Sequence, residues 1–225
     1  GGVFSRGTCV ISGCVDINKP GQYLFGFDDE EQFALELSSE TDGNCLEITS
    51  DNVQLSCANP DFPGLIPSGR LPVNALNLGL RAIAVKNVVS NYNVKITGCE
   101  ISNYDVGVEL KDSTGIVVDG NTIGSVNKGV VVNGGRENLI QANTITPRRV
   151  LGQDTLGIEV KDGSSYNTIF QNVVTGATVG IEVGDIFNSV IENTLRRNFY
   201  GIYSRKDITS ISEPNRSLIF WNHLG

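Results

Sequence analysis

A short β-type segment that recurs along most of the chain constrains its fold more than any other feature. The segment has the form Gly-Ile-x-Val, and its last five copies start 21 to 28 residues apart. A unit of this size holds two or three short runs separated by Gly or Asn, and it cannot bury its apolar side alone. Successive units must therefore stack. The copies begin at Cys45, Ala82, Gly107, Gly129, Gly157, Gly180 and Gly201.

An asparagine motif keeps the same period. Its anchors are Asn121, Asn143, Asn172, Asn193 and Asn222, each next to polar residues that alternate with aliphatic ones. We expect the first four anchors to lie at a turn between two sheets and to adopt left-handed backbone geometry. Their side-chain amides should then stack from one unit to the next.

The two repeats together predict a parallel β-helix. Leucine-rich repeats have a similar length, but they need a Leu-rich consensus and a helical return segment, whereas these units are rich in Val, Ile, Asn and Gly. In a β-helix, Ile158 and Val160 point inward and Glu159 points outward, and residues 181–183 repeat this arrangement.

Three N-terminal segments carry a resemblance to a known family. They are Ile17–Leu24, Cys45–Ile48 and Asp51–Cys57, and the two repeats follow them. The pattern resembles the right-handed parallel β-helix proteins of the pectate-lyase-like superfamily, and within it the secreted group with NosD-type repeats. That superfamily includes polysaccharide lyases, glycoside hydrolases, uronan epimerases, phage tailspikes and non-catalytic surface proteins, so the resemblance does not choose a function.

We therefore expect an all-β, right-handed parallel β-helix (solenoid) of about seven to eight coils. It should form a single domain, 1–225, with an N-terminal cap at about 1–43. Three stretches break the period, namely 59–80, 146–155 and 205–216. Insertions on a solenoid either form the walls of a groove or are merely tolerated.

Charge and hydropathy exclude two classes of partner. The chain has 17 Lys and Arg against 25 Asp and Glu, a net charge of −8, without a basic cluster. Such a chain repels phosphate backbones and anionic membranes, so we expect no nucleic-acid partner. The apolar runs are strand-sized, far below the roughly 20 residues of a membrane span, which argues against membrane insertion.

The outward positions of the repeat form the best acid–base constellation. Stacked coils lie about 4.8 Å apart, so Glu159 and Glu182 would face each other. Two carboxylates at that spacing repel by roughly 3 kcal/mol at an effective dielectric near 20. The compensation is Lys161, a bound cation such as Ca²⁺, or a raised carboxyl pKa. The alternative is a solvated sheet face with ordinary ion pairs.

If the chain is an enzyme, these residues suit proton abstraction beside a uronate carboxylate. Lys161, Tyr203 and Arg205 would serve as base and acid, and Glu159 and Glu182 as cation ligands. No cofactor is required, and calcium is the cation that these ligands would take. The candidate substrate-binding residues are Glu109, Lys111, Arg148 and Arg149.

The amino-acid composition argues against two kinds of chemistry. The only histidine is His223, which we expect to belong to the C-terminal cap, so triads built on a His base are excluded. Copper handling, which the NosD resemblance would suggest, needs imidazole or soft sulfur ligands. The chain has no Met and one His, so the sequence argues against copper.

The five cysteines indicate an oxidising compartment, and hence a secreted or extracellular protein, at a cell or virion surface. The sequence favours a disulfide between Cys9 and Cys14. Cys57 and Cys99 fall one residue out of register on stacked coils, within reach of each other. We expect Cys99 to be a buried thiol in an asparagine position.

Two functions from different classes remain. The first is an extracellular module that binds a polysaccharide or other glycan, or that acts as a surface or structural component. The second is a small polysaccharide lyase or epimerase acting on a uronate-containing polymer. The acidic charge favours the first, because a polyanionic substrate prefers a basic groove. The sequence does not fix the oligomeric state.

Overall fold

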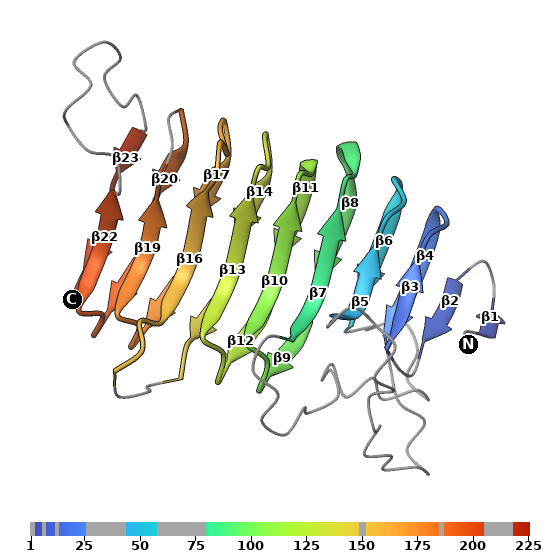
Figure 1. The fold of residues 1–225 in the computed structure, drawn as a ribbon, viewed down its shortest axis with the longest axis horizontal. Helices are drawn as coiled ribbons and strands as arrows, with labels where there is room; N and C mark the ends of the chain where they lie inside the picture. The colour runs from blue at the N-terminus through green and yellow to red at the C-terminus, as the bar shows by residue number, and fades with distance from the viewer. Residues whose placement is uncertain are drawn as a thin grey trace.

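The computed structural model describes residues 3–5, 8–11, 14–25, 44–57, 80–148, 152–184, 187–204 and 218–225. This part of the chain is built of short strands that step along one axis from the N-terminal to the C-terminal end (Figure 1). The strands form three sheets, here named A, B and C, and every adjacent pair is parallel except the first two strands of sheet A. The predicted parallel β-helix is confirmed.

Sheet A contains β1 (Val3–Ser5), β2 (Thr8–Ile11), β4 (Gly21–Phe25), β6 (Val53–Ser56), β8 (Val89–Thr97), β11 (Thr114–Asp119), β14 (Leu139–Gln141), β17 (Thr168–Phe170), β20 (Ser189–Ile191) and β23 (Leu218–Phe220). Sheet B contains β3 (Val15–Ile17), β5 (Asn44–Ile48), β7 (Arg81–Lys86), β10 (Val106–Lys111), β13 (Lys128–Asn133), β16 (Leu156–Lys161), β19 (Val179–Val183) and β22 (Tyr200–Ser204). Sheet C contains β9 (Glu100–Ser102), β12 (Thr122–Gly124), β15 (Thr144–Thr146), β18 (Val173–Thr175), β21 (Thr194–Arg196) and β24 (His223–Leu224).

Each regular coil passes through sheet B, then sheet A, then sheet C. Six strands of sheet C are described, so the three-sided part of the solenoid makes about five turns, fewer than the seven to eight coils expected. The difference arises near the N-terminus, where β3 to β6 belong to coils that have no strand of sheet C among the described residues. The predicted cap and the insertion at 205–216 lie mostly or wholly outside the described residues, as does most of 59–80.

The core consists of aliphatic columns, one residue per coil. Ile158, Ile181 and Ile202 are directly paired across neighbouring strands of sheet B, as the repeat predicted. The first two are fully buried, and Ile202 on the last coil packs against the same core. Alternate residues of each strand point inward, so the two-residue strand period places one aliphatic column in each layer.

The glycine that opens the last five Gly-Ile-x-Val segments lies where neighbouring coils approach closely. A Cβ atom on Gly157 would lie 2.3 Å from the carbonyl oxygen of Gly180 and 2.3 Å from Val174 Cγ1. No side chain fits at that distance. The recurring glycine is therefore a packing requirement of the corner between sheets C and B.

The asparagine anchors form a buried ladder at the corner between sheets A and C. Asn143 Nδ2 donates to Asn172 Oδ1 at 2.9 Å, and Asn172 Nδ2 donates to Asn193 Oδ1 at 3.0 Å. Each amide oxygen also accepts the backbone N–H of the preceding rung, as Asn172 Oδ1 does from Asn143 N at 3.0 Å. Asn121 and Asn222 extend the same ladder at its two ends. The predicted stacking is confirmed.

The left-handed geometry, however, belongs to the residue before each anchor, so that part of the prediction was wrong. Ala142, Gln171, Glu192 and Trp221 have φ between 48° and 55°, whereas none of the anchors has a positive φ. The reason is that the anchor's side chain must point inward to bond the next coil. The preceding residue makes the sharp turn and points outward.

A second ladder lies at the corner between sheets B and A. Asn138 Nδ2 donates to Asn167 Oδ1, and Asn167 Nδ2 donates to Asn188 Oδ1, both at 3.0 Å. The residues before all three rungs, Glu137, Tyr166 and Phe187, also have positive φ. The rings of Tyr166 and Phe187 stack with centroids 5.1 Å apart. Two corners of the coil are thus stabilised by the same interaction, a ladder of hydrogen-bonded asparagines.

Two disulfides connect the N-terminal coils. Cys14 bonds Cys45 and Cys57 bonds Cys99. The predicted pairing of Cys9 with Cys14 was wrong. Cys45 lies on β5, which pairs with the strand directly after Cys14, and the two Cα atoms are only 4.3 Å apart. The prediction that Cys99 is a thiol was wrong as well.

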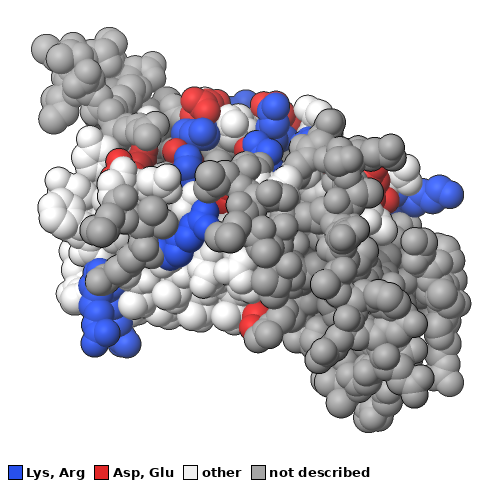
Figure 2. Space-filling model, turned by 60° about the horizontal axis from the view of Figure 1, so that its bottom comes forward, with Lys and Arg blue, Asp and Glu red and all other residues white. Residues whose placement is uncertain are grey.

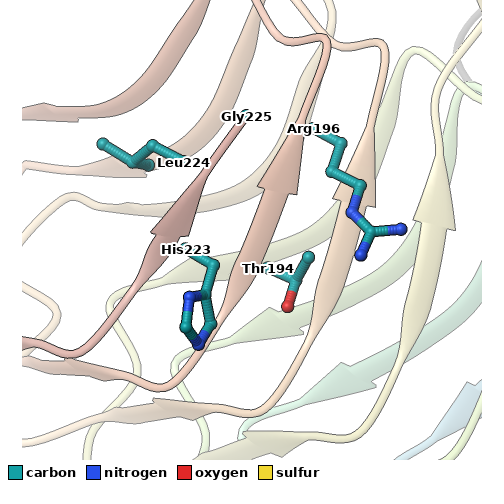
Figure 3. Close-up of a pocket in the computed structure, with 5 residues that line it drawn as sticks. All are labelled: Thr194, Arg196, His223, Leu224 and Gly225. Atoms are coloured by element: carbon teal, nitrogen blue, oxygen red, sulfur yellow. The ribbon is translucent and has the colours of Figure 1, made fainter.

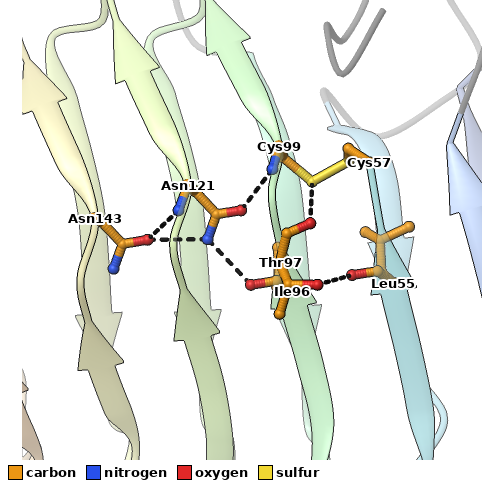
Figure 4. Close-up of a disulfide and its surroundings, with 7 residues drawn as sticks. All are labelled: Leu55, Cys57, Ile96, Thr97, Cys99, Asn121 and Asn143. Atoms are coloured by element: carbon orange, nitrogen blue, oxygen red, sulfur yellow. Dashed lines mark hydrogen bonds between the residues drawn. A yellow bond between two sulfur atoms is a disulfide. The ribbon is translucent and has the colours of Figure 1, made fainter. Parts of the chain in front are cut away.

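Cys99 nevertheless occupies the asparagine position that the sequence assigned to it. Its backbone N–H donates to Asn121 Oδ1 at 2.9 Å, so Cys99 is hydrogen-bonded to the first asparagine of the ladder on its C-terminal side (Figure 4). Toward the N-terminus the connection between coils is the covalent bond to Cys57. The hydrogen-bonded ladder therefore ends in a disulfide.

We predict that Asn172→Ala lowers the free energy of unfolding by about 3 kcal/mol, because it leaves buried backbone N–H and C=O groups without partners. Asn222→Ala is the matched control. It removes the same type of bonds from a rung that water reaches, so its cost should be less than half as large. Urea unfolding of both variants checks this, and equal costs would contradict the role of burial.

We predict that Cys57→Ser with Cys99→Ser lowers stability by about 4 kcal/mol, since the bond spans a separation of 42 residues. Replacing Cys14 and Cys45, 31 residues apart, should cost slightly less. Thermal unfolding with and without reductant checks both pairs. A wild-type midpoint that is indifferent to reductant would contradict the prediction.

Candidate functional site

The outward face of sheet B holds the residues that the sequence selected for acid–base chemistry. Glu159 pairs directly with Glu182, and Glu182 with Tyr203, so the three form one column as predicted. Lys161 lies on the same strand as Glu159, with Nζ 4.0 Å from Glu159 Oε2 and 3.7 Å from Asp162 Oδ2. Arg205 lies outside the described residues.

The closest cation to Glu159 is a residue that sequence reasoning missed. Lys128 Nζ lies 2.7 Å from Glu159 Oε2, and the glutamate is 1% exposed. Lys128 comes from the preceding coil and reaches diagonally over Val131, which stands in the carboxylate column. The sequence did contain a signal for this contact, because the column alternates glutamates with small or aliphatic residues. A small or aliphatic residue in the column leaves room for a basic side chain of the same strand.

The same diagonal pairing recurs along sheet B. Arg81 Nε forms an ion pair with Glu109, and Lys86 Nζ bonds Glu47 Oε2 at 2.6 Å, both beside Ala84 in the column. The carboxylates are thus largely buried and already bound by basic side chains. This arrangement matches ordinary ion pairing on a sheet face more closely than a poised catalytic group.

The candidate substrate-binding residues do not meet at one place. Glu109 is 6% exposed and paired, while Lys111 is exposed. Arg148 Nε donates to Asn127 Oδ1 at 2.6 Å and its guanidinium lies 4.0 Å from Asp105 Oδ1, so it ties two coils together. Arg149 lies outside the described residues.

Tyr104 illustrates a polar group that the fold keeps neutral. Its ring is 1% exposed, and burial raises the pKa of its phenol far above the ordinary value. Since desolvation disfavours the phenolate, Tyr104 stays protonated at any physiological pH. It belongs to the core rather than to a site.

We predict that Lys128→Ala lowers the free energy of unfolding by about 2 kcal/mol, because it leaves the buried Glu159 carboxylate without its nearest cation. The figure is below that of a fully buried pair, since the Lys128 side chain is 32% exposed. Lys161→Ala is the control and should cost clearly less, as its ammonium lies 4.0 Å away. Chemical denaturation measures both, and a larger cost for Lys161 would contradict the assignment.

A different surface, at the C-terminal end, is hollowed. One hollow of about 640 Å³ lies over the corner between sheets A and C and is lined by Gln171, Glu192, Thr194, Trp221, Asn222 and His223. A second, of about 360 Å³, lies beside it on sheet C (Figure 3). It is lined by Thr194, Arg196, His223, Leu224 and Gly225. Thr194 and His223 line both, so the two hollows are adjacent.

The larger hollow is built by the residues before the asparagine anchors. Gln171, Glu192 and Trp221 stand at equivalent positions on three successive coils, all with positive φ. The corresponding positions on earlier coils are Gly98, Gly120 and Ala142. Positive φ is shared by Glu137, Tyr166 and Phe187 at the other corner, so the turn geometry does not single these positions out. What distinguishes them is size, because the described positions before the other anchors hold only Gly or Ala.

These side chains are also held in place. Gln171 Nε2 donates to Glu192 Oε2 at 2.9 Å, which orients both groups along the corner. Trp221 is 76% exposed, and its ring contacts Phe220 edge to face at 6.4 Å between centroids. His223 is exposed on β24, the last strand of sheet C, and it lines both hollows, while its place in a C-terminal cap stays a prediction.

The comparisons with known proteins address the family. The family model described as periplasmic copper-binding protein (NosD) matches residues 74–224, which include the asparagine ladders and the larger hollow. The chain belongs to the NosD family. No curated protein matches the chain.

A solved structure has a similar outline. It is the crystal structure of DFA-IIIase from Arthrobacter chlorophenolicus A6 in complex with GF2, with 15% sequence identity and a TM-score of 0.48. The match covers 96% of this chain and 66% of that one, so the NosD-family chain spans slightly less than two thirds of its length.

The residues of this NosD-family chain do not fit a copper site. Proteins bind copper through imidazole, thiolate and thioether groups. The chain has one His and no Met, and four of its five Cys are in disulfides. Across the described ranges, no group of three or more His, Cys, Asp or Glu could hold a metal ion. Calcium at Glu159 and Glu182 stays a prediction, with Lys128 as the competing cation.

The disulfides of this NosD-family chain fit an oxidising compartment, such as the periplasm or the extracellular space. The part of the chain that the structure describes contains no helix with the length and apolar character of a membrane span.

Proposed function

We propose that this chain is a glycan-binding module of the periplasm or cell exterior, and that it binds its ligand in the larger hollow. The observation that carries the proposal is the exposed Trp221 ring beside the oriented Gln171 and Glu192 side chains and His223. A sugar ring has an apolar C–H face and a rim of hydroxyls. An aromatic surface with a few placed polar groups complements both.

The chemistry of each lining residue supports this ligand class. Glu192 accepts hydrogen bonds from sugar hydroxyls, and Gln171 both donates and accepts. Because Gln171 already bonds Glu192, the pair is preorganised, and little side-chain entropy remains to be lost on binding. The ladder beneath fixes the backbone that carries them, as Asn193 is fully buried and bonded on both sides.

A lyase or epimerase acting on a uronate polymer is the second candidate, and Arg196 next to His223 in the smaller hollow favours an acidic ligand. For the catalytic residues first selected, the ion pairs are an obstacle. Lys161 lies near two carboxylates, so it would have to leave them to act as a base. A binding function needs no such rearrangement, and for this reason we prefer it.

We predict that Trp221→Ala weakens glycan binding at least about tenfold, since the aromatic surface is removed. Phe199→Ala is the matched control, because Phe199 is 77% exposed against 76% for Trp221 and does not line either hollow. Isothermal titration with neutral and uronate-containing hexasaccharides measures both variants. Binding unchanged by Trp221→Ala, or an absence of binding across the panel, would overturn the proposal.

A further inference from the structure

The outward face of sheet C has a composition different from that of the other two sheets. Its outward positions alternate with the buried Ile101, Ile123 and Ile145 along the strands. On the three middle coils these positions are hydroxyl-bearing or small, interrupted by one valine. They are Thr122, Gly124, Thr144, Thr146, Val173 and Thr175.

This row of hydroxyls is available to a ligand. Thr122, Thr144 and Thr146 are exposed, and within the described ranges their hydroxyls have no hydrogen bond to another protein group. The bottom of the solenoid in Figure 1, where β9 and β12 lie, is turned forward in Figure 2. There the lower left part of the described surface is mostly uncharged, with basic side chains at its C-terminal edge.

Strand propensity does not account for the row. Threonine favours any half-buried strand, so propensity alone would spread it over all three sheets. Sheet B instead carries ion pairs outward, and sheet A carries Lys95, Asp119, apolar side chains and half-buried hydroxyls such as Thr168 and Ser189. The exposed threonines lie on the sheet that leads into the two hollows, where Thr194 continues the column and His223 ends it.

The geometry of the row is periodic and regular. The pairing of β9, β12, β15, β18, β21 and β24 is parallel, and no register shift occurs between any two of them. The coils are therefore spaced by about 4.8 Å, the ordinary distance between strands. This spacing is close to the length of one pyranose unit in an extended chain, so one sugar can meet one coil.

We propose that the ligand is an extended, neutral polysaccharide that runs along the solenoid axis over sheet C, with one of its sugars in the Trp221 hollow. This inference rests on the proposed glycan-binding function and specifies its ligand. Neutrality follows from the absence of charged outward side chains between Glu100 and Arg196 on the described strands of sheet C. We infer that the ligand is a long chain because several coils of sheet C precede the hollow.

Isothermal titration with neutral β-linked oligosaccharides, from disaccharide to hexasaccharide, tests the proposal on the full chain. The affinity should rise with length, because each added sugar meets another coil. The double variant Thr122→Val and Thr144→Val keeps the shape but removes two hydroxyls. It should bind the hexasaccharide about tenfold more weakly and the disaccharide as tightly as wild type does.

The matched control carries Thr168→Val and Ser189→Ala, which remove two half-buried hydroxyls from the outward face of sheet A. It should bind both sugars like wild type. A hexasaccharide that binds no tighter than a disaccharide, or a threonine double variant without effect, overturns the inference while the hollow remains a glycan site. Tighter binding of uronate chains than of neutral chains would contradict the proposal that the ligand is neutral. If the wild-type protein binds none of the glycans, the proposed function is contradicted as well.

Discussion

The buried asparagine ladders are the interaction on which the rest of this structure depends. A solenoid corner turns the backbone away from its sheet and would leave N–H and C=O groups buried without partners, at about 1–3 kcal/mol each. Each rung satisfies a backbone N–H and a backbone carbonyl of the preceding coil, as Asn172 does for Asn143 N and Ile140 O. The ladder thereby fixes the register between coils, and the aliphatic columns of the core follow from that register.

The ladder also decides what the surface can present. Because each anchor points inward, the residue before it takes the left-handed turn and projects outward at a fixed place on every coil. At the N-terminal end this position holds glycine, which suits the geometry, and at the C-terminal end it holds Gln171, Glu192 and Trp221. The turn that the ladder imposes thus places three polar or aromatic side chains at equivalent positions on successive coils of the surface.

Much of the fold was predictable from the sequence, because the period, the inward columns and the stacking of the anchors all follow from spacing. The site was less accessible. The acidic column was placed correctly, but the ion pair between Lys128 and Glu159 depends on a diagonal contact between coils that linear columns do not reveal. The prediction of the disulfide pairing was wrong for a related reason, since Cys14 and Cys45 are far apart in sequence and adjacent only across the sheet. The hollow was missed because His223 was assigned only to the C-terminal cap.

Trp221 is the only tryptophan in the chain, so its fluorescence reports on the hollow without interference from other indoles. Titration of the wild-type protein with a neutral oligosaccharide that binds by calorimetry is the most direct measurement. The structure predicts a saturable change in tryptophan emission whose midpoint equals the calorimetric affinity. Calorimetric binding with unchanged emission would place the glycan elsewhere and contradict the central claim.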